Sequence, residues 1–188
     1  MAKKQMLQQN ISVTGFDTAI FLKELEVIDK INVWLDRHFQ AGALARWVDK
    51  HDGGTVSLDI GNRIFTPSRL TAVEDRAAFS PDVDPYGSLA KLAGDEFVHA
   101  ADNEVNYYRL FCNQPYVLNF SFADMLIIGS YPVAPTLYRC GDVVQVNLTV
   151  NIFPTKTSAR MGFVLRSVTL MESRFTMVSI CYLGDPSC

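Results

Sequence analysis

Two β-rich runs joined by a short polar loop constrain the fold of this chain more than any other feature. Residues 139–154 open on a Gly-Asp turn and continue as a long run of β-branched and alternating polar residues. After the loop, residues 160–171 form a second run rich in Val, Leu and Thr. A turn followed by two such runs is typical of paired antiparallel strands. We therefore expect this region to belong to a small antiparallel β-barrel.

The clearest helical pattern covers residues 17–39. Apolar residues recur every three or four positions from Ile20 to Phe39, and charged residues fill the opposite side. Asp17 fits the N-cap, and Gly42 or the turn after it would end the helix. We expect the aromatic and aliphatic side of this helix to pack in the core rather than to form a ligand groove.

Most of the remaining chain is predicted to be β-structure. The exception is the stretch 67–94, where three prolines predict irregular structure with a short helix over 88–93. A Gly-Asn turn at 61–62 is expected to join two strands of a hairpin. The expected strands cover residues 55–60, 63–66, 105–111, 116–122, 125–128, 143–153, 163–170 and 176–183.

These elements predict one α+β domain over residues 1–188, because 188 residues (21.0 kDa) suffice for one well-buried core. Residues 1–50 form the helical region, and residues 51–188 are mainly β. Short, hairpin-length connections favour antiparallel pairing. The expected architecture is therefore an N-terminal helix followed by an antiparallel, OB-like β-barrel.

The charges are unevenly distributed along the sequence. The whole chain carries a formal net charge of -3, which argues mildly against a dedicated binder of phosphate backbones. Residues 137–178, however, contain five basic and two acidic side chains, so the β-rich region is mildly basic and the remainder is acidic. This asymmetry is either scatter over a solvated surface or the trace of an anion-binding face.

Cysteine spacing and the opening residues favour an intracellular protein, cytoplasmic or nuclear. The four cysteines lie far apart and form no CxxC pair, so we expect buried, reduced thiols and no metal site. The opening residues do not have the apolar run of a secretory signal, and no stretch is apolar enough to span a bilayer. We expect no membrane partner.

A cluster of acidic residues around one histidine is the densest group with metal-binding or acid/base chemistry. Carboxylates beside an imidazole can hold a metal ion or move protons. Their spacing matches no helix-borne ligand motif, and neither a nucleophile elbow nor a Gly-rich phosphate loop is present. We expect no catalytic residues and no cofactor, but leave open whether this cluster forms a site. Its members are Asp95, Glu96, His99, Asp102 and Glu104.

Aromatic and basic residues on the expected strands are the remaining candidate site. Single-stranded nucleic acid is held by rings that stack on bases and by Lys and Arg along the backbone. The alternative is that these rings fill the interior of a barrel. Phe111, Phe120 and Phe122 are further rings on this predicted surface. The proposed nucleic-acid-binding residues are Tyr107, Tyr108, Arg109, Phe153, Lys156, Arg160, Phe163 and Arg166.

The second half of the chain resembles a group of uncharacterised proteins from mushroom-forming fungi. The resemblance lies in Asp-Pro-Tyr-Gly at 84–87, Val-His at 98–99, the run 102–108, Gly-Asp-Val-Val-Gln-Val at 141–146 and the run 160–170. It implies no known activity.

The runs 141–153 and 162–170 are also similar to the paired strands of phage-type single-stranded-DNA-binding proteins with an OB fold. In that family, a strand opened by Gly is answered after a flexible loop by another Gly-initiated strand. The chain departs from the family in its C-terminal residues, which are not an acidic tail, and in its expected N-terminal helix. The resemblance implies an OB-like sheet that binds single-stranded nucleic acid.

Together these observations predict a non-enzymatic protein that binds single-stranded nucleic acid through aromatic and basic residues on an OB-like sheet. The alternative is a protein-interaction or self-assembly module, in which exposed strand edges and aromatic patches pair with another chain or with a second copy in a homo-oligomer.

Overall fold

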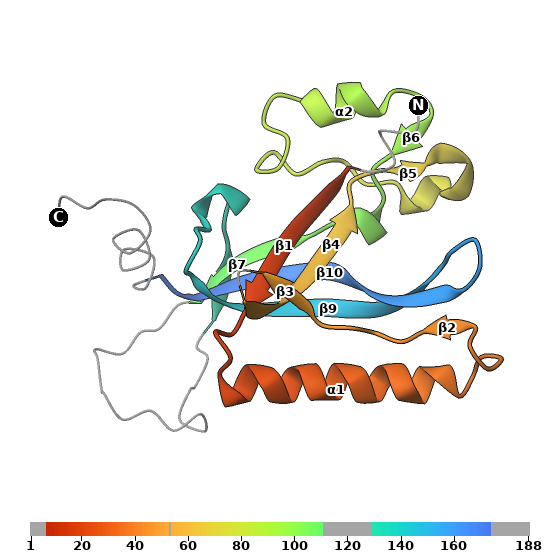
Figure 1. Cartoon of the computed structure of the whole chain (residues 1–188). Helices are drawn as coiled ribbons and strands as arrows, with labels where there is room; N and C mark the ends of the chain where they lie inside the picture. The colour runs from red at the N-terminus through yellow and green to blue at the C-terminus, as the bar shows by residue number, and fades with distance from the viewer. Residues whose placement is uncertain (1–6, 53, 111–128, 174–188) are drawn as a thin grey trace. The chain divides into compact units, whose positions relative to one another are not determined.

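The structure is a computed structural model that describes residues 7–52, 54–110 and 129–173 (Figure 1). It divides into two compact units. The α1 unit comprises Met6–Arg63 and Leu148–Leu165, and the α2 unit comprises Met1–Gln5, Ile64–Asn147 and Arg166–Cys188. Each unit is described by itself.

The α1 unit begins with a strand rather than with the expected helix. β1 (Gln8–Thr14) pairs antiparallel with β4 (Thr55–Arg63) along its whole length, from Gln8 opposite Arg63 to Thr14 opposite Ser57. Ile11 and Val13 are partly buried while the residues between them are exposed, so the segment has the period of two that a half-buried strand requires. This alternation was hidden by the polar residues around it.

The predicted helix is present, but it is shorter than expected and buries less of its apolar surface. α1 (Ala19–Asp36) begins after Thr18, not after Asp17, which lies in a turn with φ 56°. Only Leu25 and Asn32 are buried on this helix, whereas Ile20 and Trp34 are largely exposed. The prediction that its aromatic side packs in the core is therefore wrong for Trp34.

Two short strands and the first half of a long strand also belong to the α1 unit. β2 (Leu44–Ala45) pairs in parallel with the start of β10 (Ala159–Glu172), and β3 (Lys50–Asp52) forms an antiparallel hairpin with β4. The predicted turn at 61–62 is wrong, because β4 continues through these residues to Arg63. The hairpin is instead formed by β3 and β4, and its turn lies between Asp52 and Thr55.

The long β-hairpin predicted from the sequence is confirmed. β9 (Val143–Pro154) pairs with β10, and a four-residue loop joins them, closed by a hydrogen bond from Thr155 N to Ser158 O at 2.7 Å. Gly141, at φ 91°, occupies the left-handed region in the turn before β9, where a side chain would be strained.

The α2 unit combines short strands with a small apolar core. β7 (Asn106–Leu110) lies between the end of β10, with which it is parallel, and β8 (Ser130–Pro132), with which it is antiparallel. β5 (Thr66–Pro67) and β6 (Phe97–Val98) form a separate two-stranded sheet, and α2 covers Ser88–Ala93 as predicted. Phe65, Ala93 and Phe97 form a buried cluster. Among the described residues of this unit, single-turn 3-10 helices cover Ser68–Leu70, Val73–Asp75, Ala101–Asn103 and Pro135–Leu137.

The prediction of an antiparallel, OB-like barrel is wrong. The larger sheet is mixed, because β10 pairs in parallel with β2, β4 and β7. It is also open, since within the described residues β1 pairs only with β4 and β8 only with β7. Neighbouring parallel strands require a long connection, and the chain between β4 and β10 provides one.

Three predicted strands, at 116–122, 125–128 and 176–183, lie outside the described residues. The single-domain assignment stays a prediction.

Candidate functional site

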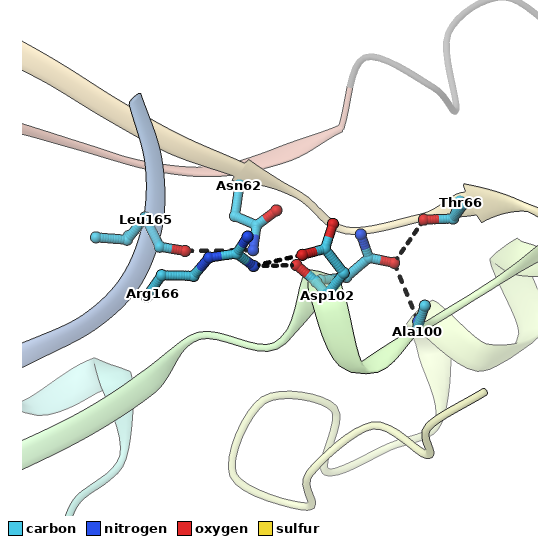
Figure 2. A network of polar contacts seen from close by, with 7 residues as sticks. Asn62, Thr66, Ala100, Asp102, Leu165 and Arg166 are labelled. Carbon is cyan, nitrogen blue, oxygen red and sulfur yellow. Dashed lines mark hydrogen bonds and ion pairs between the residues drawn. The ribbon is translucent and has the colours of Figure 1, made fainter. Parts of the chain in front are cut away.

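An open cavity of about 750 Å³ lies within the α1 unit. β4 and β10 pair at a single position, Gly61 opposite Val164, and a hydrogen bond from Asn62 Nδ2 to Leu165 O at 3.2 Å holds them together there (Figure 2). Towards the N-terminal ends of these two strands, residues 57–61 and 160–163 line the cavity without pairing to each other. We call this cavity the β4–β10 cleft. It arises because two parallel strands meet at one point only.

Three aromatic rings line the cleft. Trp47 and Phe163 meet edge to face, with ring centroids 6.2 Å apart and planes at 85°. The backbone N–H of Trp47 donates to Oδ1 of Asn32 at 3.1 Å, so a buried side chain of α1 fixes the position of this residue. Phe153 contributes the third ring and is 38% exposed.

Gly162 determines where the Phe153 ring lies. A Cβ atom added to Gly162 would stand 2.8 Å from Cε2 and 3.0 Å from Cδ2 of Phe153, closer than real Cβ contacts allow. The ring therefore rests against the bare backbone of the neighbouring strand, which is how an aromatic residue commonly covers a glycine in a sheet. This contact holds the ring against the strand, while Phe153 remains partly exposed.

The cleft also holds a neutralised ion pair. The carboxylate of Asp59 accepts from Lys50 Nζ at 2.6 Å and from Ser12 Oγ at 2.7 Å. These hydrogen bonds, that of Lys50 first, lower the pKa of Asp59 below its ordinary value. Asp59 is therefore ionised at neutral pH, and Lys50 balances its charge.

Two exposed cations belong to the β9–β10 hairpin, and neither side chain forms a hydrogen bond or ion pair with another described residue. Arg160 lines the cleft, and Lys156 lies in the loop between β9 and β10. With the Lys50–Asp59 pair balanced, Arg160 contributes an uncompensated positive charge to the cleft.

Four of the eight predicted nucleic-acid-binding residues thus lie on one hairpin of the α1 unit, and three of those four line the cleft. They are Phe153, Lys156, Arg160 and Phe163, of which Lys156 is outside the lining. Four residues of the cleft were not predicted as site residues: Trp47, which was assigned to the turn ending the helix, and Lys50, Asp59 and Gly162. The alternation of residues 55–60 could have placed Asp59 on an exposed strand face; nothing local indicated that Trp47 would meet Phe163.

The other four predicted residues belong to the α2 unit, where structural contacts engage the side chains of Tyr107 and Arg166 and the backbone of Tyr108. Tyr138 places its hydroxyl 2.6 Å from Tyr108 O and 2.7 Å from Val168 O, and accepts from Tyr108 N at 3.1 Å. Tyr107 packs edge to face against Tyr138 at 5.6 Å, and burial raises the pKa of its hydroxyl, with a smaller contribution from Tyr138.

Arg166 is held by the chain itself. Its Nη1 atom lies 2.7 Å from Oδ1 and 2.8 Å from the backbone oxygen of Asp102 (Figure 2). Arg109 is exposed on β7. Phe111, Phe120 and Phe122 lie outside the described residues.

The residues of the acidic cluster have separate surroundings in the structure. His99 is 7% exposed, stacks on Phe79 with ring centroids 4.2 Å apart, and places Nδ1 3.0 Å from Ile64 O. Asp102 binds Arg166, and Asp95, Glu96 and Glu104 are exposed. No group of three or more potential metal ligands occurs among the described residues. The histidine of this cluster is a packed structural residue.

The Asp-Pro-Tyr-Gly motif at 84–87 has a local structural role. The Asp84 carboxylate accepts from Ser88 N at 2.7 Å and Ala90 N at 3.0 Å, and Gly87 enters α2 at φ 64°. Although burial works to raise the pKa of Asp84, the hydrogen bonds from Ala90, Leu89 and Ser88 outweigh it and lower the pKa. The motif caps a helix.

Cys140 is exposed, contrary to the prediction of buried thiols, and the other three cysteines lie outside the described residues. Neither described helix is long and apolar enough to cross a bilayer.

The chain matches no family model, no curated protein and no solved structure. Its resemblance to uncharacterised fungal proteins stays a prediction. The resemblance to phage-type proteins implied an OB-like barrel, but the sheet is open and mixed. A function in nucleic-acid binding therefore depends on the cleft alone.

Proposed function

We propose that this protein binds single-stranded nucleic acid in the β4–β10 cleft. The observation that carries the proposal is the convergence of three rings and an uncompensated arginine on one open cavity. Flat, ring-shaped ligands stack on such rings, and a guanidinium pairs with phosphate. Binding in the β4–β10 cleft does not require an OB fold.

The roles of the residues follow from their positions. Phe153 offers a partly exposed ring fixed by Gly162, and the Trp47–Phe163 pair offers a second apolar surface. Arg160 in the cleft and Lys156 in the adjoining loop supply two positive charges that can pair with the phosphate backbone of the nucleic acid. The volume of the cleft, about 750 Å³, lies within the range of roughly 300–1,000 Å³ that is typical of ligand pockets. The cleft can therefore accommodate a short stretch of single-stranded nucleic acid.

The cleft contains its own reporter. Trp47 lines it, whereas Trp34 does not, so the Trp34→Phe protein has one tryptophan whose fluorescence responds to a stacked base. We expect single-stranded oligothymidine to quench this signal. If two cations bind phosphate, the slope of log affinity against log salt is about -1.4, because each contact to a single strand contributes about -0.7.

Two variants test the proposal. Phe153→Ala should lower affinity by about 1–3 kcal/mol, the contribution of one stacked base. Arg160→Ala should weaken binding and reduce the salt slope by about 0.7. The control is Arg46→Ala, which removes an exposed arginine of the same unit outside the cleft. Unchanged Trp47 fluorescence at high oligonucleotide concentration, or equal losses in Arg46→Ala and Arg160→Ala, would overturn the proposal.

A further inference from the structure

The outer side of α1 carries a second apolar stripe that its own unit does not cover. Ile20, Val27 and Trp34 recur every seven residues and are 71%, 47% and 57% exposed. Residues seven apart lie nearly above one another on a helix, so the three side chains form one line. Trp34 is fixed by an edge contact with His38, at a centroid distance of 4.9 Å. We call this line the α1 stripe.

A row of cations borders the stripe along its length. Lys23, Lys30 and Arg37 each follow a stripe residue by three positions, which places them beside it on the helix surface. None of the three side chains forms a hydrogen bond or ion pair with another described residue. The exposed face therefore combines an apolar line with three cations on one side, while Glu24 lies on the other side, so the flanking charge is positive on balance.

An unusual turn extends the stripe beyond the helix. Thr18 N donates to Gly15 O at 3.0 Å, and the residues between them, Phe16 and Asp17, have φ values of 47° and 56°. Non-glycine residues seldom adopt this conformation, which costs about 1 kcal/mol or more for each. The turn displays Phe16 at 75% exposure ahead of Ile20. A strained backbone that exposes an aromatic ring indicates a binding role.

The α2 unit exposes a surface of the opposite kind. Leu70, Val73 and Tyr86 are 68%, 74% and 85% exposed. Between residues 70 and 86 there are four acidic residues and one basic residue. Two of the acids, Glu74 and Asp75, directly follow Val73 in the same 3-10 turn. This segment, which we call the acidic segment, combines exposed apolar side chains with net negative charge.

We propose that the α1 stripe of one copy of this chain binds the acidic segment of a second copy. Both surfaces are apolar, and their flanking charges are opposite in sign, so each complements the other. The charges favour this partner over an anionic bilayer, because α1 as a whole carries four acidic and two basic residues and a flat surface would meet both. Two different surfaces joined in this way make a head-to-tail contact. The proposal does not depend on nucleic-acid binding.

Charge reversal and its rescue test the contact without any nucleic acid. Sedimentation of the wild-type chain should give a mass that rises with concentration and falls back at high salt. The Lys23→Glu/Lys30→Glu variant should stay monomeric, and so should Glu74→Lys/Asp75→Lys. An equimolar mixture of the two variants should associate again, because the unchanged stripe of one variant can bind the unchanged acidic segment of the other, and their two reversed surfaces are also opposite in charge.

A matched control separates the stripe from general charge effects. Asp36→Lys changes an exposed charge two residues after Trp34, roughly 200° round the helix, and should associate like the wild type. Circular dichroism verifies that all variants keep the fold. A monomer at every wild-type concentration, association unchanged by either reversal, or a mixture that fails to recover would each overturn the proposal.

Discussion

Two groups of aromatic and basic residues that look alike in the sequence behave differently in the two units. In the α2 unit, the Tyr107 ring on β7 packs against Tyr138, and Arg166 on β10 pairs with Asp102. On the β9–β10 hairpin of the α1 unit, Phe153 remains partly exposed and Arg160 has no partner among the described side chains. Residue type is thus shared, and availability is decided by contacts distant in sequence.

The comparison teaches that a tertiary partner changes the role of a side chain. Tyr138 is 30 residues from both of the strands that it bridges, and Asp102 is 64 residues from Arg166. Each partner satisfies a polar group that would otherwise be free to bind a ligand. The α2 group should therefore govern stability, and the α1 group should govern binding.

The largest effect is expected from removing the hydroxyl that bridges β7 and β10. Tyr138→Phe should lower the free energy of unfolding by about 1–3 kcal/mol, because it leaves the backbone groups of Tyr108 and Val168 without this partner. Urea unfolding measures the change. Tyr131→Phe, on an exposed ring of β8, is the matched control and should change little. Equal effects of the two variants would contradict the structural role of Tyr138.

At Gly162 we expect a smaller effect, which should fall on binding rather than on stability. An added methyl group would push the Phe153 ring away from its strand, so Gly162→Ala should weaken oligothymidine binding by up to about tenfold. Stability should change by less than about 1 kcal/mol, because the half-open ring can move and alanine reduces the entropy of the unfolded chain. Trp47 fluorescence and urea unfolding measure the two quantities. Gly129→Ala, which meets no neighbouring atom, is the control.

A direct comparison of two arginines on β10 sharpens the contrast. Arg166→Ala should lower stability by up to about 1 kcal/mol, since its ion pair with Asp102 is partly exposed, and should leave binding unchanged. Arg160→Ala should weaken binding and leave stability unchanged. The two substituted arginines lie six positions apart on one strand. If both affected binding alike, the division of roles between the groups would be wrong.

Local patterns predicted the elements that depend on neighbours in sequence. The β9–β10 hairpin, strand β7 and helix α2 were predicted from alternation, turn residues and the positions of prolines, which are all local signals. The sheet order could not be predicted, because β10 pairs with β4 and β7 across more than 50 residues. Nothing local distinguishes a parallel partner from an antiparallel one.

The candidate site was half predictable for the same reason. Phe153, Arg160 and Phe163 were identified by type on a predicted hairpin, and they line the cleft. Trp47 reaches it because Asn32, 15 residues away, holds its backbone. Single-residue patterns cannot reveal that such a contact forms.

The smallest effect concerns the ion pair inside the cleft, where stability and binding should respond with opposite signs. Since the folded pKa of Asp59 is lowered, its contribution to stability is present above the unfolded value of about 3.9 and is lost as pH falls through the folded pKa. Asp59→Asn should therefore cost a few tenths of a kcal/mol up to about 1 kcal/mol at pH 7, because the pair is half exposed, and this difference should shrink below about pH 4. The same variant removes a negative charge from the cleft, so oligothymidine should bind more tightly at pH 7. Urea unfolding at pH 7, 5 and 3.5, with fluorescence titration at pH 7, measures both. Weaker binding by Asp59→Asn would show that the Asp59 carboxylate contacts the ligand instead of merely balancing Lys50.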